Sequence, residues 1–83
     1  MAVQRKRVGV AFGSALSTLR RAAGLTQEEL AERAGCVPHY VSAMENGHQL
    51  PSVALLVALE EALGAPPGEL IRRTREGLRK RPA

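Results

Sequence analysis

The sequence is poor in the residues that crosslink or anchor many small proteins. It has one cysteine, no tryptophan, and only Phe12 and Tyr40 as aromatic residues, so its core must be built from aliphatic side chains. A single cysteine cannot form a disulfide within the chain, and no signal-peptide pattern is present, so we expect a reducing, cytoplasmic setting. The longest apolar run, VALLVAL at residues 53–59, is far shorter than the ~20 residues of a membrane-spanning helix. At 83 residues the chain forms one domain at most.

The sequence also lacks the residue combinations that carry catalysis. No nucleophile with a base, glycine-rich phosphate loop or metal-ligand set is present. His39 and His48 have no further Cys/His cluster around them, which argues against zinc. We therefore expect no enzyme, no cofactor, no metal and no small-molecule ligand. For Cys36 two roles remain, a small buried hydrophobic residue, which we favour, or a redox sensor.

Charge is divided unevenly along the chain. Residues 1–7 carry +3 through Arg5, Lys6 and Arg7, residues 8–71 carry −4, and residues 72–83 carry +5. Two basic ends on a slightly acidic body suggest a polyanion partner such as nucleic acid, or less often an anionic membrane. The alternative is that the charges only keep a small protein soluble, and we favour a solvated helix face for the arginines that follow Arg72.

Glycines and prolines divide the chain into segments whose apolar residues recur at helical spacing. This pattern predicts an all-α fold of five helices, over residues 10–23, 27–34, 38–46, 53–63 and 67–80. Residues 1–7 are expected to form a disordered basic arm, residues 8–80 the folded domain with a C-terminal dimerisation helix, and residues 81–83 a tail.

The second and third predicted helices lie close together in the sequence. Thr26 and Glu29 have the spacing of a capping box at the start of the second helix. Gly35 permits the left-handed backbone of a sharp turn, and Pro38 suits the first position of the third helix. These features predict a helix-turn-helix whose second helix projects into the DNA major groove.

The fourth predicted helix is apolar on nearly every face, so we expect it to be buried on most of them. In so short a chain, part of that burial should come from a second subunit. Glu60 falls on the inner stripe of this helix, where it either reaches solvent at the edge, which we favour, or pairs with an arginine across a subunit interface. The residues expected at a dimer interface are Leu55, Val57, Ile71 and Leu78.

Two stretches together resemble the Cro/repressor-type helix-turn-helix family, also called the XRE family, whose fold is lambda-repressor-like. They are LRRAAGLTQEELAERAGCVPHYVSAMENG and PSVALLVALEEALGAPPGELI, and the resemblance covers residues 12–71. It implies a five-helix DNA-binding domain that acts as a homodimer on a palindromic operator of double-stranded DNA. Half-sites would then lie ~34 Å apart, one turn of DNA.

The resemblance also implies roles for individual residues. Gln27, at the start of the second helix, and Asn46 would contact backbone phosphates. Arg20 and Glu45 would form a largely buried ion pair that ties the first helix to the end of the third. Cys36 stands where the family usually has valine.

The positions that contact bases in this family lie at the start and on the outer face of the third helix. Here the sequence departs from the pattern, because none of these positions holds an Arg, Lys, Gln or Asn for a bidentate base contact. We expect specificity to depend on few direct contacts, on DNA shape, and on the Arg5–Lys6–Arg7 arm entering a groove. The expected base-contacting residues are Val37, Pro38, His39, Ser42 and Ala43, with Tyr40 near the backbone.

The sequence leaves several functions open. Within the family its length resembles restriction–modification controller proteins, phage Cro-like repressors and stand-alone antitoxins, and it does not distinguish an activator from a repressor. A protein-interaction module, such as an antitoxin-like subunit that mainly binds another protein, is the alternative to a DNA-binding regulator. The weak recognition helix favours that alternative, whereas Gln27, Asn46 and the basic ends favour DNA.

Overall fold

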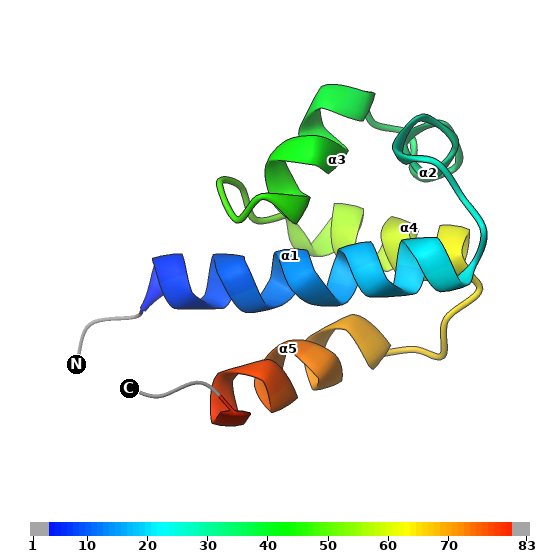
Figure 1. Cartoon of the computed structure of the whole chain (residues 1–83). Coiled ribbons are helices and arrows are strands. Elements are labelled where there is room, and N and C mark those ends of the chain that lie inside the picture. The colour runs from blue at the N-terminus through cyan, green and yellow to red at the C-terminus, as the bar shows by residue number, and fades with distance from the viewer. Residues whose placement is uncertain (1–3, 81–83) are drawn as a thin grey trace.

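The computed structural model describes residues 4–80, and over that range the chain forms five helices and no strand (Figure 1). This confirms the predicted all-α architecture. None of these helices is long and apolar enough to cross a membrane. The helices are α1 (Arg5–Ala22), α2 (Gln27–Ala34), α3 (Pro38–Glu45), α4 (Val53–Leu63) and α5 (Glu69–Lys80).

Local signals define both ends of α2 and the start of α4. Thr26 Oγ1 accepts from the Glu29 N–H at 3.0 Å, and the Glu29 carboxylate accepts from the Thr26 N–H at 2.9 Å, which confirms the capping box. Gly35 ends α2 with φ +80°, the left-handed conformation that glycine adopts at little cost. Ser52 caps α4 by accepting from the Leu55 N–H at 3.1 Å.

Helix α1 begins earlier than the sequence predicted. The expectation of a disordered arm over residues 1–7 is wrong for Arg5–Arg7, which form the first turn of α1. Lys and Arg are good helix formers, and Ala11 and Phe12 anchor the following turn in the core. Arg7 also donates from Nη2 to the Leu78 carbonyl at 3.5 Å. Residues 1–3 of the arm and the predicted tail 81–83 lie outside the described residues.

The core is aliphatic apart from Phe12, as the composition required. Helix α1 runs between α3 and α5 and contacts both (Figure 1). At Gly13 it approaches α3 so closely that a Cβ would lie 2.5 Å from the Met44 carbonyl oxygen and 2.6 Å from that of Glu45. The fully buried large side chains are Leu16, Leu30, Val41, Met44, Leu59 and Leu70.

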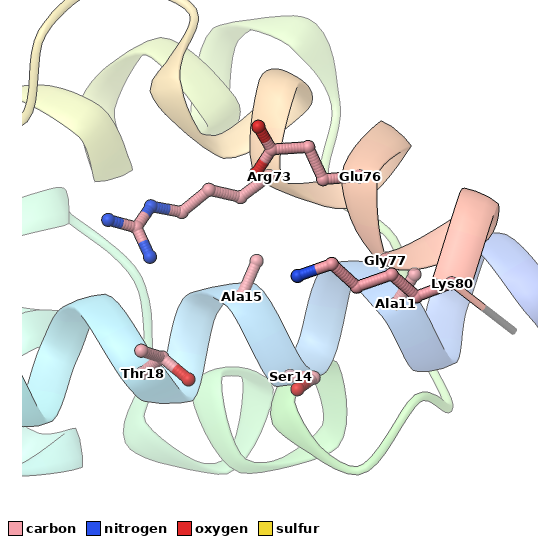
Figure 2. Close-up of a pocket in the computed structure, with 8 residues that line it drawn as sticks. All are labelled: Ala11, Ser14, Ala15, Thr18, Arg73, Glu76, Gly77 and Lys80. Carbon is pink, nitrogen blue, oxygen red and sulfur yellow. The ribbon is translucent and has the colours of Figure 1, made fainter.

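Small residues line the contact between α1 and α5. A Cβ added at Gly77 would lie 3.4 Å from the Ala11 Cβ, an ordinary van der Waals contact. A shallow hollow of about 180 Å³ remains beside this contact, and Figure 2 shows Arg73 and Lys80 reaching from α5 over its α1 floor, which includes Ser14. The hollow is lined by residues of α1 and α5, and Figure 1 shows α5 and α3 on opposite sides of α1.

Glu60 connects α4 to α5 in a way that neither sequence interpretation anticipated. Its side chain is buried, with 9% of the residue exposed, rather than at a solvent edge. Its two carboxylate oxygens accept from the backbone N–H groups of Gly68 and Leu70, each at 2.9 Å. The carboxylate therefore satisfies N–H groups at the start of α5 that have no partner within the helix, and it lies at the positive end of the helix dipole. Helix α5 accordingly begins at Glu69 rather than at the predicted Pro67.

Helix α4 is only partly buried within the single chain, as expected if a second subunit supplies the rest of its burial. Only Leu59 and Glu60 are buried, and Val53 and Val57 are 77% and 50% exposed. Ile71 on α5 is also 50% exposed. The chain alone thus leaves apolar side chains of α4 and α5 in solvent.

Candidate nucleic-acid interface

Helix α3 has one buried face and one free face. Val41 and Met44 are fully buried and pack with Leu30 and Ala31 of α2. On the other side, His39 is exposed and Ser42 and Ala43 are half-buried. Figure 1 shows α3 at one end of the molecule, with no described helix covering that outer side. A rigid helix is therefore presented to solvent by its contacts with α1 and α2.

The start of α3 carries the most exposed of the predicted base-contacting residues. Val37 is the N-cap, lies in an extended backbone conformation and is 63% exposed, and Pro38 and His39 follow it in solvent. At the other end of the helix Asn46 is exposed, with its Nδ2 3.5 Å from the Ser42 Oγ. The structure thus brings together five of the six predicted residues on one surface, together with Asn46.

Tyr40 is the predicted residue that lies apart. Its hydroxyl donates to the Leu50 carbonyl at 3.1 Å, and its ring packs partly against the core. The hydroxyl joins α3 to the loop before α4, which is a structural contact. We therefore assign Tyr40 to positioning this loop.

A network of three polar side chains joins α1, α2 and the end of α3. The ion pair expected between Arg20 and Glu45 is present, with Nε–Oε2 2.6 Å and Nη2–Oε1 3.1 Å, and both side chains are nearly buried. Arg20 Nη1 also donates to the Leu25 carbonyl at 2.8 Å. The hydrogen bond to Glu45 raises the pKa of the Arg20 guanidinium above its ordinary value. This bidentate geometry fixes the end of α3 relative to α1.

Gln27 also belongs to this network. Its Nε2 donates to Glu45 Oε1 at 2.9 Å, so the side chain is held in one orientation. Among residues 4–80 its carboxamide oxygen and second N–H have no other bonded partner, so they are available to an external one. Gln27 lies in a hollow of about 500 Å³ between the start of α2 and α3, lined by Arg20, Thr26, Gln27, Glu28, Pro38, His39 and Ser42.

A second hollow, of about 330 Å³, lies beside the loop that follows α3. Arg5 and Lys6 are exposed on α1 and face this loop, whereas Arg7 is half-buried and directed to α5. The structure therefore separates the three basic residues that the sequence grouped as one arm. The residues lining this hollow are Arg5, Lys6, Gly9, Gly47, His48, Gln49 and Leu50.

His48 and Gln49 also line this hollow, although the sequence analysis did not single them out. Both are exposed and follow the end of α3 by three and four residues. Their position directly after Glu45-Asn46-Gly47 was the available signal. The neighbouring Arg5 and Lys6 gave none, because they are about 40 residues away in the sequence and only the fold brings them here.

Cys36 and the histidines do not form a chemical centre. Cys36 is half-buried at the turn, and burial raises the pKa of its thiol above the ordinary value. A higher pKa means less thiolate and lower reactivity. Within residues 4–80 no three His, Cys, Asp or Glu side chains are grouped as metal ligands would be.

The four residues expected at a dimer interface differ in exposure. Val57 and Ile71 are half-exposed, whereas Leu55 packs partly against the core and Leu78 is half-buried, with its carbonyl accepting from Arg7. On α4 and α5, Val57 and Ile71, with the more exposed Val53, are large apolar residues whose burial would require another molecule.

A short helix, a glycine turn and a free second helix, beside exposed basic residues, define a DNA-binding helix-turn-helix protein. Residues 11–74 match the helix-turn-helix domain family, and the chain belongs to it. Proteins of this family are non-enzymatic DNA-binding transcriptional regulators, and the solved relatives are of the Cro/C1 type, which confirms the resemblance seen in the sequence.

Individual relatives agree with this assignment. The chain is 44% identical over 64 residues to the uncharacterized HTH-type transcriptional regulator y4dJ of Sinorhizobium fredii (strain NBRC 101917 / NGR234), covering 77% of this chain and 83% of that protein. It is similar to the restriction–modification controller protein C.AhdI of Aeromonas hydrophila, at 40% identity and a TM-score of 0.72 over 75% and 94% of the two chains. It is also similar to the clp gene regulator ClgR of Corynebacterium glutamicum, at 32% identity and a TM-score of 0.81 over 87% and 77%.

Proposed function

We propose that this protein is a cytoplasmic, sequence-specific transcriptional regulator. It would bind a palindromic operator as a homodimer, with α3 in the major groove. The observation that carries the proposal is the exposure of the outer side of α3, whose inner side is fixed by Val41, Met44 and the Glu45 network. An element that is rigid on one side and free on the other suits insertion into a groove. The relatives supply the biological context, since they are named as a transcriptional regulator, a gene regulator and a controller protein.

Phosphate contacts would flank α3 at both ends. At its start, Gln27 and other residues at the N-terminus of α2 line the first hollow, and a helix N-terminus favours phosphate. At its end, Asn46 is exposed and Arg5 and Lys6 lie beside the loop. Because Arg5 and Lys6 are helical, we replace the flexible groove-inserting arm of the sequence interpretation with a fixed phosphate contact. Arg7 is assigned to α5 instead.

The homodimer would bury the apolar side chains that the single chain exposes. Val53 and Val57 of α4 and Ile71 of α5 are all at least half exposed. Apolar surface of this kind is commonly an interface between subunits. Two-fold pairing through α4 and α5 would place the two copies of α3 ~34 Å apart, one helical turn of DNA.

Selection from a random pool of DNA duplexes tests the proposed function. Purified full-length protein is expected to enrich a palindrome whose half-sites are one helical turn apart, and the free protein should sediment as a dimer. Enrichment of an asymmetric site by a monomer would contradict the homodimer proposal while supporting sequence-specific binding. Absence of any enriched sequence would contradict the regulator proposal and favour the protein-interaction module.

The Arg5/Lys6 contact has its own test on the selected operator. The double variant Arg5→Gln/Lys6→Gln is expected to weaken binding and to reduce the slope of log affinity against log salt by about 2 for each subunit, since each lost phosphate contact contributes about 0.9. Arg21→Gln/Arg33→Gln is the matched control, because both residues are exposed and neither lines either hollow. Equal slopes for the two double variants would refute the contact.

A further inference from the structure

The N-cap of α3 is occupied by a residue that does not suit helix capping. Ser, Thr, Asn and Asp are preferred at this position because their side chains accept from the first free N–H groups, and Val37 makes no such bond. The valine is not retained for the core either, since it is 63% exposed. An exposed residue that breaks a local rule without a structural gain is typical of a functional position.

The outer surface of α3, which starts at Val37, has few polar groups able to recognise bases. Between residues 37 and 45 the only charged side chain is Glu45, which is committed to Arg20 and Gln27. Arginine contacts to guanine and carboxamide contacts to adenine are therefore not available from α3. Pro38 extends the exposed apolar surface at its start, and Ala43 adds a half-buried methyl group further along.

The major groove presents one apolar feature to such a surface, the C5-methyl group of thymine. We propose that the start of α3 recognises pyrimidine 5-methyl groups, with Val37 and Pro38 as the specificity-determining contact. Operator half-sites would then require thymine opposite the α3 N-terminus, while His39 and Ser42 add hydrogen bonds to neighbouring base edges. This inference rests on the proposed function and deepens it, because it names the chemical group that the recognition surface binds.

Replacement of single thymines by deoxyuridine in the selected operator tests the contact. Uracil lacks only the methyl group and keeps the same hydrogen-bonding edge. Each contacted methyl should be worth about fourfold in affinity, the equivalent of ~0.8 kcal/mol for one buried carbon. We expect this loss at one or two thymines per half-site and no loss at the others. At the same positions, 5-methylcytosine should bind better than cytosine, which assigns the effect to the methyl group rather than to the oxygen.

Variants of valine assign the effect to the protein side of the contact. Val37→Ser supplies the missing cap, so it is expected to raise the melting temperature. It should also bring the thymine–uracil affinity ratio toward 1 at the thymine that Val37 contacts. Val53→Ala is the matched control, because Val53 is an exposed valine at the start of α4 and lines neither hollow beside α3. It should leave the thymine–uracil affinity ratio near fourfold, even if weaker dimer formation lowers the overall affinity.

The outcomes separate this inference from the proposed function. Specific binding that is unchanged by uracil at every thymine would overturn the methyl contact and leave the regulator proposal intact. Thymine–uracil affinity ratios that are unchanged at every thymine in Val37→Ser would overturn the assignment to Val37. Failure to enrich any duplex would overturn both proposals together.

Discussion

Substitution of Gly13 by alanine should separate α3 from α1 and destabilise the whole domain. The added Cβ would lie 2.5 Å and 2.6 Å from two backbone oxygens at the end of α3. A carbon–oxygen contact normally rests at roughly 3.3–3.6 Å, so the helices must move apart by roughly 0.8 Å. Neither oxygen belongs to a flexible side chain that could rotate away.

The magnitude follows from two opposing effects. Overpacking typically costs up to about 3 kcal/mol, and the upper end applies because the obstacle is backbone. Alanine in place of glycine within a helix returns about 1 kcal/mol. The expected net loss is therefore about 2 kcal/mol in the free energy of unfolding, or a fall of roughly 8–16 °C in the melting temperature for a domain of this size.

Gly77→Ala is the control for this prediction, because it makes the same chemical change in a helix with room for it. The nearest atom to its added Cβ is the Ala11 Cβ at 3.4 Å. Helix propensity should then dominate and stabilise the domain by up to about 1 kcal/mol. Thermal unfolding followed by circular dichroism measures both variants. A Gly13→Ala protein as stable as the wild type, or two variants with shifts of the same sign, would refute the reasoning from close helix approach.

Three further substitutions test the polar contacts. Glu45→Ala leaves Arg20 nearly buried without its partner and should cost about 3–5 kcal/mol in chemical denaturation; an unchanged midpoint would contradict this. Glu60→Ala leaves two N–H groups at the start of α5 unpaired. It should lower the free energy of unfolding by about 1–3 kcal/mol and speed hydrogen exchange at the start of α5. Equal exchange rates would show that the cap is unimportant. The backbone N–H of Thr26 holds the pKa of Glu29 below its ordinary value of 4.5. The stabilisation is therefore complete above pH 4.5 and is lost as the pH falls through the lowered pKa. Glu29→Gln should flatten the acid side of the stability curve in that window, and a curve of the same shape would count against it.

The sequence predicted the elements whose signals are local. The capping box of Thr26 and Glu29 and the glycine turn at Gly35 each depend on residues within one helical turn, and both appear as expected. The pairing of Arg20 with Glu45 is not local, and it was anticipated only because the resemblance carried it across 25 residues. The helix-turn-helix could therefore be predicted from local sequence signals together with the family resemblance.

The errors have a common physical cause, since each depends on which elements meet in space. Glu60 could not be assigned from periodicity, because its partners are backbone N–H groups of the next helix. Arg7 is helical in part because α5 lies beside it. The hydrogen bond from the Tyr40 hydroxyl to the Leu50 carbonyl was likewise not visible in the sequence, because the two residues meet only in the folded chain. The exposure of Val53 and Val57 on α4 agrees with the expectation that a single chain does not bury all of this helix. A helical pattern shows which residues are apolar but not what covers them.

The most direct test of DNA recognition by α3 compares the selected operator's affinity for two serine-to-glutamate variants. Ser42→Glu places a negative charge on the free side of α3, whereas Ser14→Glu places it beside the α1–α5 hollow (Figure 2). With melting temperatures measured in parallel, Ser42→Glu is expected to lose operator binding down to the non-specific level, and Ser14→Glu to bind as the wild type does. Operator affinity that survives Ser42→Glu in a folded protein would contradict the account.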